Sequence, residues 1–121
     1  MELSESYYKM KKLPVRILAL IATSLNYPYP VSIQDIINFV KQYKDVNENG
    51  IRRIVTDLKR QLLVKHVGRG VYELTHYGLQ RLRWYWLQGM IPDEYKHWAI
   101  DTVRCKRRVK KEDGEVEVVY L

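Results

Sequence analysis

The chain has 121 residues, of which 46% are hydrophobic and 29% are charged, and its formal net charge is +7. This length is typical of one domain, and the hydrophobic fraction is large enough to form a core. No apolar run approaches the length of a membrane-spanning helix, and the acidic start of the chain differs from a signal peptide. The single cysteine, Cys105, excludes an internal disulfide and a cysteine-based zinc site. We therefore expect a cytoplasmic protein that is not bound to a membrane.

The positive charge is concentrated in the middle of the chain. Residues 51–90 contain eight Lys and Arg against two Asp and Glu, whereas residues 1–50 contain six against five. Residues 91–121 are balanced at seven against seven, although six of those cations fall within 104–111. A strongly basic segment favours a polyanionic partner, so the middle of the chain is the first candidate for a binding surface.

Two helices are expected in the first third of the chain. Residues 1–12 are a loose or helical lead-in, and apolar residues at three- and four-residue steps then predict a helix over about 13–25. Pro14 suits the first turn of that helix, because a missing N–H costs nothing there. Ser32 is a good N-cap for a second helix over about 33–43.

A third helix is expected over about 48–62, with Asn47 as the first candidate for its N-cap and Asp45 as a competing one. An apolar stripe marks one side of this helix. The opposite side carries cations and hydrogen-bonding side chains, so the helix presents a basic face to its surroundings. The residues of that basic face are Asn49, Arg52, Arg53, Thr56, Lys59 and Arg60.

A short β-hairpin is expected after the third helix, over about 64–75. Two runs of β-forming residues flank Gly68-Arg69-Gly70, a combination that is typical of a tight turn between two strands. Thr75 is the expected N-cap of a fourth helix over about 76–89, and Gly89 and Pro92 end that helix.

The last part of the chain, residues 91–121, is expected to form an extension. It begins with a short helix over about 93–102. Farther on, Asp113-Gly114 favours the two-residue turn of a second β-hairpin. In the register that such a turn implies, Lys110 faces Glu117.

The order of helix, capped helix, turn, helix, β-hairpin and helix resembles a winged helix-turn-helix domain over residues 13–90. The resemblance is carried by residues 32–78, SIQDIINFVKQYKDVNENGIRRIVTDLKRQLLVKHVGRGVYELTHYG. It implies an α+β fold with a three-helix core, a β-hairpin wing and a fourth helix. The C-terminal β-hairpin extension of this chain has no counterpart in that pattern. Winged-helix regulators usually place glycine where Leu62 stands, because the residue that closes the third helix is left-handed. We therefore expect this helix to end differently here.

The resemblance implies binding to double-stranded DNA, with the helix over about 48–62 in the major groove and the wing over about 64–75 on the backbone or minor groove. The residue types agree, because asparagine and arginine can make bidentate contacts with base edges while threonine and lysine suit phosphates. The predicted function is that of a transcriptional regulator without a cofactor. The predicted DNA-binding residues are Asn49, Arg52, Arg53, Thr56, Lys59, Arg60, Lys65 and Arg69.

The fourth helix carries more large apolar side chains than one small domain usually needs. They either cover the first helix and the segment that follows, or they form the interface of a homodimer. We expect the homodimer, since two-fold pairing also places two recognition helices about one DNA turn apart. The predicted interface residues are Leu82, Trp84, Trp86, Leu87 and Met90.

Two other functions remain open. The domain could be a protein interaction module that docks through the aromatic face of the fourth helix or through the C-terminal hairpin. It could also be an accessory factor of replication or repair that binds nucleic acid without sequence preference. An enzyme is not expected, because the chain contains no nucleophile motif, paired carboxylates or phosphate-binding loop. The three histidines lack ligand spacing, so no metal site is expected.

Overall fold

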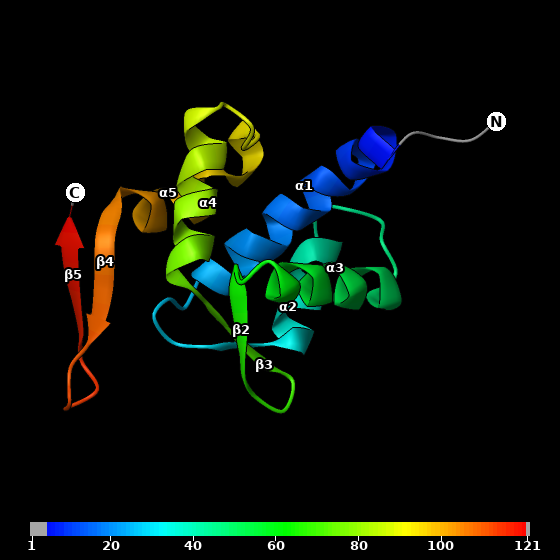
Figure 1. Cartoon of the computed structure of the whole chain (residues 1–121). Helices are drawn as coiled ribbons and strands as arrows, with labels where there is room; N and C mark the ends of the chain where they lie inside the picture. Colours follow the sequence, from blue (N-terminus) through cyan, green and yellow to red (C-terminus); the bar gives the residue numbers. More distant parts are fainter. Residues whose placement is uncertain (1–4, 121) are drawn as a thin grey trace.

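The computed structural model describes the backbone of residues 5–120 and the side chains of residues 12–100, 102–104 and 111–115. The fold is α+β, with a small three-stranded sheet beside the helices and a separate two-stranded ribbon at the C-terminal end (Figure 1). In chain order the elements are α1 (Glu5–Ser24), β1 (Val31–Ser32), α2 (Ile33–Lys41), α3 (Glu48–Arg60), β2 (Val64–Gly68), β3 (Val71–Leu74), α4 (His76–Leu87), α5 (Asp93–Arg104), β4 (Cys105–Lys110) and β5 (Val116–Tyr120).

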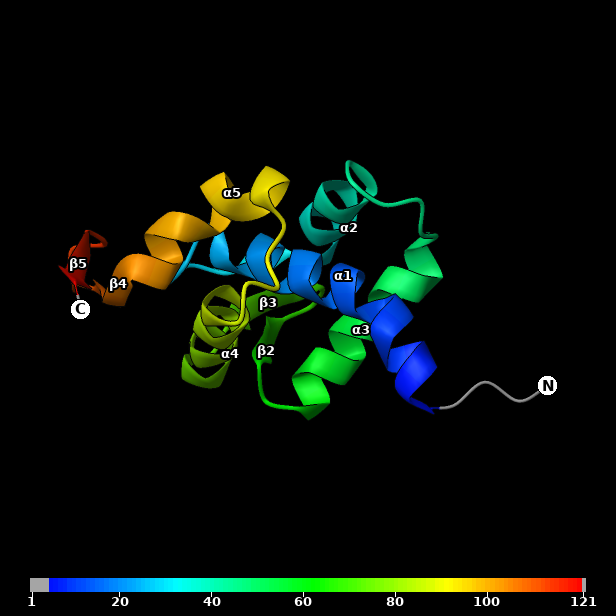
Figure 2. The ribbon, with the colours of Figure 1, turned by 90° about the horizontal axis from the view of Figure 1, so that it is seen from above.

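Helix α1 is the centre of the core. Every residue from Ile17 to Ser24 is buried, and α1 contacts α2, α3, α4, α5 and β3. Figure 2 shows α1 crossing the middle of the molecule, with α2 and α3 toward one end and α4 and α5 toward the other. A helix that is apolar on most of its circumference is stable only when neighbours surround it, and here they do. Within the described residues, no helix is long and apolar enough to cross a membrane.

The start of α1 differs from the prediction. The helix begins at Glu5, so Pro14 lies inside it and not in its first turn. Neither glycine nor another proline interrupts the eight residues before position 13. A proline removes one helical hydrogen bond but does not by itself prevent a helix on both sides of it. The predicted lead-in over 1–12 is therefore helical from Glu5 onward.

The three predicted N-caps are confirmed. The Ser32 side chain accepts a hydrogen bond from the backbone N–H of residue 35, and Asn47 accepts one from Gly50 at 2.8 Å. Thr75 accepts one from the N–H of Gly78 at 3.0 Å. Each bond satisfies a backbone donor that the first turn of a helix leaves without a partner. Asn47, and not Asp45, is therefore the N-cap of α3.

The end of α3 was predicted wrongly. Leu62 adopts the left-handed conformation, with φ of 64°, so the helix closes in the usual way but with leucine. The N–H of Leu62 donates to the carbonyl of Lys59, and the N–H of Leu63 donates to that of Leu58, each at 3.0 Å. This pair of bonds defines a Schellman motif, which a contact between the apolar residues at its two ends supports. Leu58 and Leu63 are both buried.

The sheet is antiparallel with the strand order β1-β3-β2. Val31 of β1 pairs with Tyr72, and Val64 of β2 pairs with Leu74. The predicted hairpin over 64–75 is thus the β2–β3 hairpin, and β1 adds a third strand directly before α2. The register of the β2–β3 pair shifts once near the tip, between residues 66 and 68.

Helix α5 belongs to the same core as the preceding elements. Tyr95 and Ala99 are buried, and the indole N–H of Trp98 donates to the hydroxyl of Tyr43 at 2.7 Å. The Trp98 ring also packs edge-on against Phe39 of α2, with ring centroids 5.6 Å apart. The first part of the predicted extension over 91–121 therefore packs on α1 and α2.

The C-terminal hairpin forms, but its register was predicted wrongly. Lys110 lies opposite Val116, and Glu117 lies opposite the preceding residue of β4. The turn contains three residues and not two, since the N–H of Lys111 donates to the carbonyl of Glu115 at 2.8 Å. Gly114 takes the left-handed position, with φ of 87°. A three-residue loop of this kind shifts every strand pair by one relative to a two-residue turn.

Candidate nucleic-acid interface

Helix α3 has one buried side and one polar side, as its sequence predicts. Ile51, Val55 and Leu58 are at most 1% exposed, because this stripe packs against α1 and α2. The opposite side is open to solvent. All six residues of the predicted basic face are exposed, namely Asn49, Arg52, Arg53, Thr56, Lys59 and Arg60.

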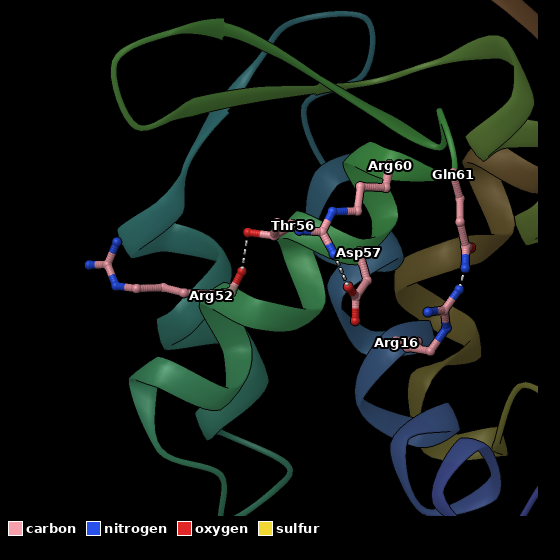
Figure 3. Close-up of polar contacts among 6 residues, drawn as sticks. All are labelled: Arg16, Arg52, Thr56, Asp57, Arg60 and Gln61. Carbon is pink, nitrogen blue, oxygen red and sulfur yellow. Dashed lines mark hydrogen bonds and ion pairs between the residues drawn. The ribbon is translucent and has the colours of Figure 1, made fainter. Parts of the chain in front are cut away.

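Figure 3 shows the polar contacts along the basic face of α3. The Thr56 hydroxyl donates to the backbone carbonyl of Arg52 at 3.0 Å, while the Arg52 side chain extends away from the helix. Arg60 turns back toward Asp57, with 3.7 Å between guanidinium nitrogen and carboxylate oxygen. The Arg60 side chain is 78% exposed. Ion pairs that are as open to water as this one contribute little to stability. Arg60 is therefore free to exchange this carboxylate for a phosphate at small cost.

The other cations of the basic face have no carboxylate partner among the residues that the structure describes. Arg52, Arg53 and Lys59 form no ion pair there, and Glu48 and Asp57 are the acids of the helix. An excess of unpaired positive charge on one helix face produces a local positive potential, which attracts polyanions from a distance.

The β2–β3 hairpin contributes two cations of different kinds. Arg69 is exposed at the tip, next to Gly70, whose φ of 67° permits the tight turn. The Gly70 carbonyl accepts a hydrogen bond from the N–H of Ile33 at 2.7 Å, which anchors the tip to the start of α2. Lys65 lies opposite Glu73 in the strand register, so an acidic residue is its cross-strand neighbour, whereas Arg69 at the tip has no such neighbour in the register. Arg69 is consequently the stronger candidate of the two.

Helix α1 has a cation that contacts the end of α3, a contact that the sequence did not indicate. Arg16 donates a hydrogen bond to the side-chain carbonyl of Gln61, the residue that follows α3 (Figure 3). Arg16 lies between two buried positions, Val15 and Ile17, yet its own side chain is only half-buried. A cation in an otherwise buried run is the signal that would have singled it out.

The predicted dimer residues do not share one exposed surface. Leu82 is fully buried, and Trp86 and Met90 pack against the core. Trp84 and Leu87 are exposed, at 48% and 79%. Most of the apolar stripe of α4 therefore covers this chain's own core. Leu82 is not available to a second copy, and Trp86 and Met90 are only partly exposed.

No group of three or more His, Cys, Asp or Glu side chains within the described residues is placed to hold a metal ion. The chain matches no protein-family model, no curated protein and no solved structure.

Proposed function

We propose that this protein is a transcriptional regulator that binds double-stranded DNA through a winged helix-turn-helix. The observation that carries the proposal is the solvent side of α3, where four cations and two hydrogen-bonding side chains are exposed together. Such a face is complementary to the phosphates and base edges of a major groove, which is wide enough to admit an α-helix.

The architecture supports the proposal. Helices α2 and α3 follow one another through a short turn, and the β2–β3 hairpin follows α3 directly. Strand β1 completes the small sheet in the order β1-β3-β2, an arrangement that is compatible with a winged helix-turn-helix. In this assignment α3 is the recognition helix and the β2–β3 hairpin is the wing.

The proposed roles follow from side-chain chemistry and position. Asn49 and Arg53 lie in the first half of α3 and read base edges. The Arg53 side chain can donate two parallel hydrogen bonds, and the Asn49 side chain can donate one and accept one. Lys59 and Arg60, in the last turn, bind phosphates and set the register of the helix on the duplex. Arg69 reaches the adjacent backbone or minor groove from the wing.

The experiment is a titration of labelled duplexes, selected from a random pool, over a series of salt concentrations. We expect the logarithm of affinity to fall linearly with the logarithm of salt concentration. The slope of this line should be about −0.9 for each phosphate that the protein neutralises. Arg69→Ala should weaken all duplexes alike and lower this slope by about one unit. Arg53→Ala should instead erode the preference between sequences, by about 1–3 kcal/mol at one base position.

A matched control removes the same charge elsewhere. Lys96→Ala, on α5, should leave both the slope and the sequence preference unchanged. If Arg53→Ala weakens every duplex equally, the protein is an accessory factor that binds nucleic acid without sequence preference. If neither Arg53→Ala nor Arg69→Ala changes binding, α3 and the wing are not the interface and the proposal fails.

A further inference from the structure

A hollow lies at the corner where α3 ends and α4 begins. Its volume is about 550 Å³. Leu62 and Gln61 contribute from the end of α3, and Tyr77, Arg81 and Trp84 contribute from one side of α4. The proposed DNA contacts use none of these five residues.

Three large apolar side chains line the hollow and remain open to solvent. Leu62 is 63% exposed, Tyr77 is 59% exposed and Trp84 is 48% exposed. Tyr77 and Trp84 are two helical turns apart and so lie on the same side of α4. Single exposed apolar residues are ordinary on protein surfaces, whereas several around one concave site mark a surface for association.

The corner is held rigidly by the backbone around it. The Thr75 hydroxyl donates to the carbonyl of Leu62, and the N–H of Thr75 donates to that of Leu63 at 3.1 Å. Helix α4 approaches so closely that a Cβ added to Gly78 would lie 2.1 Å from the Leu63 carbonyl oxygen. A preorganised site loses little conformational freedom when a partner binds, which favours affinity.

Leu62 is the least expected residue of the hollow. Its left-handed φ of 64° is a conformation that glycine adopts without strain and that costs leucine about 1–2 kcal/mol. Its side chain is 63% exposed, so burial in this chain returns little of that cost. Strained backbone conformations of this kind cluster at functional positions.

The charge around the hollow limits what can bind there. Arg81 is exposed, with its guanidinium carbon 6.0 Å from the centroid of the Trp84 ring, and neither Asp nor Glu lines the hollow. Arg16 lies nearby through its hydrogen bond to Gln61. A second copy that docked through the same face would bring its Arg81 toward this one, which is unfavourable. An acidic partner is complementary.

We propose that this hollow binds a short segment of another protein, one that carries an aliphatic or aromatic anchor flanked by Asp or Glu. The anchor packs between Leu62, Tyr77 and Trp84, and the flanking carboxylate pairs with Arg81. Since Leu62 lies two residues beyond the end of α3, the bound partner would sit beside the proposed DNA interface, so the protein would recruit that partner to DNA.

The test uses short random peptides displayed on phage and panned against the full chain. We expect the selected peptides to share one large apolar residue with acidic neighbours. Leu62→Gly should weaken the best of these peptides about tenfold, because burial of a leucine side chain is lost. Arg81→Glu should abolish the preference for acidic flanks. Leu62→Gly also relieves backbone strain, so its weaker binding cannot be attributed to unfolding.

Two control variants separate this proposal from the proposed function. Leu87→Ala, at a side chain that is 79% exposed on α4 but outside the hollow, should bind the peptide normally. Arg53→Ala should lose sequence preference on DNA yet keep peptide affinity. Failure to select any peptide, a consensus with basic flanks, or equal binding by Leu62→Gly would overturn the proposal. So would sedimentation that shows self-association lost in Leu62→Gly, since the occupant would then be a second copy.

Discussion

Helices α3 and α4 end in the same motif but with different residues. At the end of α4 the N–H of Gly89 donates to the carbonyl of Trp86 at 3.0 Å, and the N–H of Met90 donates to that of Tyr85 at 2.9 Å. These two bonds repeat the pattern around Leu62 at the end of α3. The φ angles also agree, at 69° for Gly89 and 64° for Leu62.

The two ends teach that one backbone geometry can have two origins. A Cβ added at Gly89 would meet nothing within 4 Å, so the conformation there is permitted by the glycine itself. At the end of α3 the conformation is imposed on a leucine by neighbouring chain, since Thr75 holds its carbonyl and α4 packs at Gly78. The first end is a local feature, and the second depends on tertiary structure.

The largest effect on this comparison is expected from Gly78→Ala. The new Cβ would lie 2.1 Å from the Leu63 carbonyl oxygen and 2.6 Å from a Leu74 methyl carbon, so α4 must move off the corner. We expect the free energy of unfolding to fall by about 3 kcal/mol, at the upper end of overpacking effects, measured by urea denaturation. Gly89→Ala is the control, with open space around it and a cost of about 1 kcal/mol from φ alone. Equal losses in the two variants would contradict the close packing at Gly78.

A smaller loss is expected from Thr75→Ala. The Thr75 hydroxyl accepts from the N–H of Gly78 and donates to the Leu62 carbonyl. Its removal therefore loses both the N-cap of α4 and the hydrogen bond that holds Leu62 after the end of α3. We expect a loss of about 2 kcal/mol, against about 1 kcal/mol for Ser32→Ala, where one cap bond is lost. Urea denaturation measures both. Thr75→Ser keeps the hydroxyl and should stay near the parent, and a serine variant as weak as the alanine variant would refute this role.

The sequence predicted the features that local chemistry determines. Ser32, Asn47 and Thr75 are caps because their side chains reach backbone donors only three residues away, and the polar side of α3 follows from helical periodicity. The α+β class followed from the order of these elements, and the solvent exposure of the cations on α3 followed from the same periodicity.

The features that were missed depend on contacts between distant segments. Leu62 is left-handed because residues 75 and 78 hold it, and no propensity of leucine indicates this. Leu82 is buried because α4 packs on α1, although its apolar stripe also suited a dimer. The register opposite Lys110 changed with one residue of turn length, which short-range turn signals do not determine.

The smallest expected effect comes from the residue that distinguishes the two helix ends. Leu62→Gly removes strain of about 1–2 kcal/mol but adds about 0.5–1 kcal/mol of chain entropy to the unfolded state, so stability should rise by about 0.5–1 kcal/mol. Gly89→Leu, the reciprocal change, should lower stability by a similar amount. The loss comes from the left-handed φ alone, because the open space around Gly89 leaves no clash to add to it. Thermal and urea denaturation of both variants provide the measurement. If Leu62→Gly is less stable than the parent, the Leu62 side chain supports the fold after all, and its exposure at the hollow needs no binding partner to account for it.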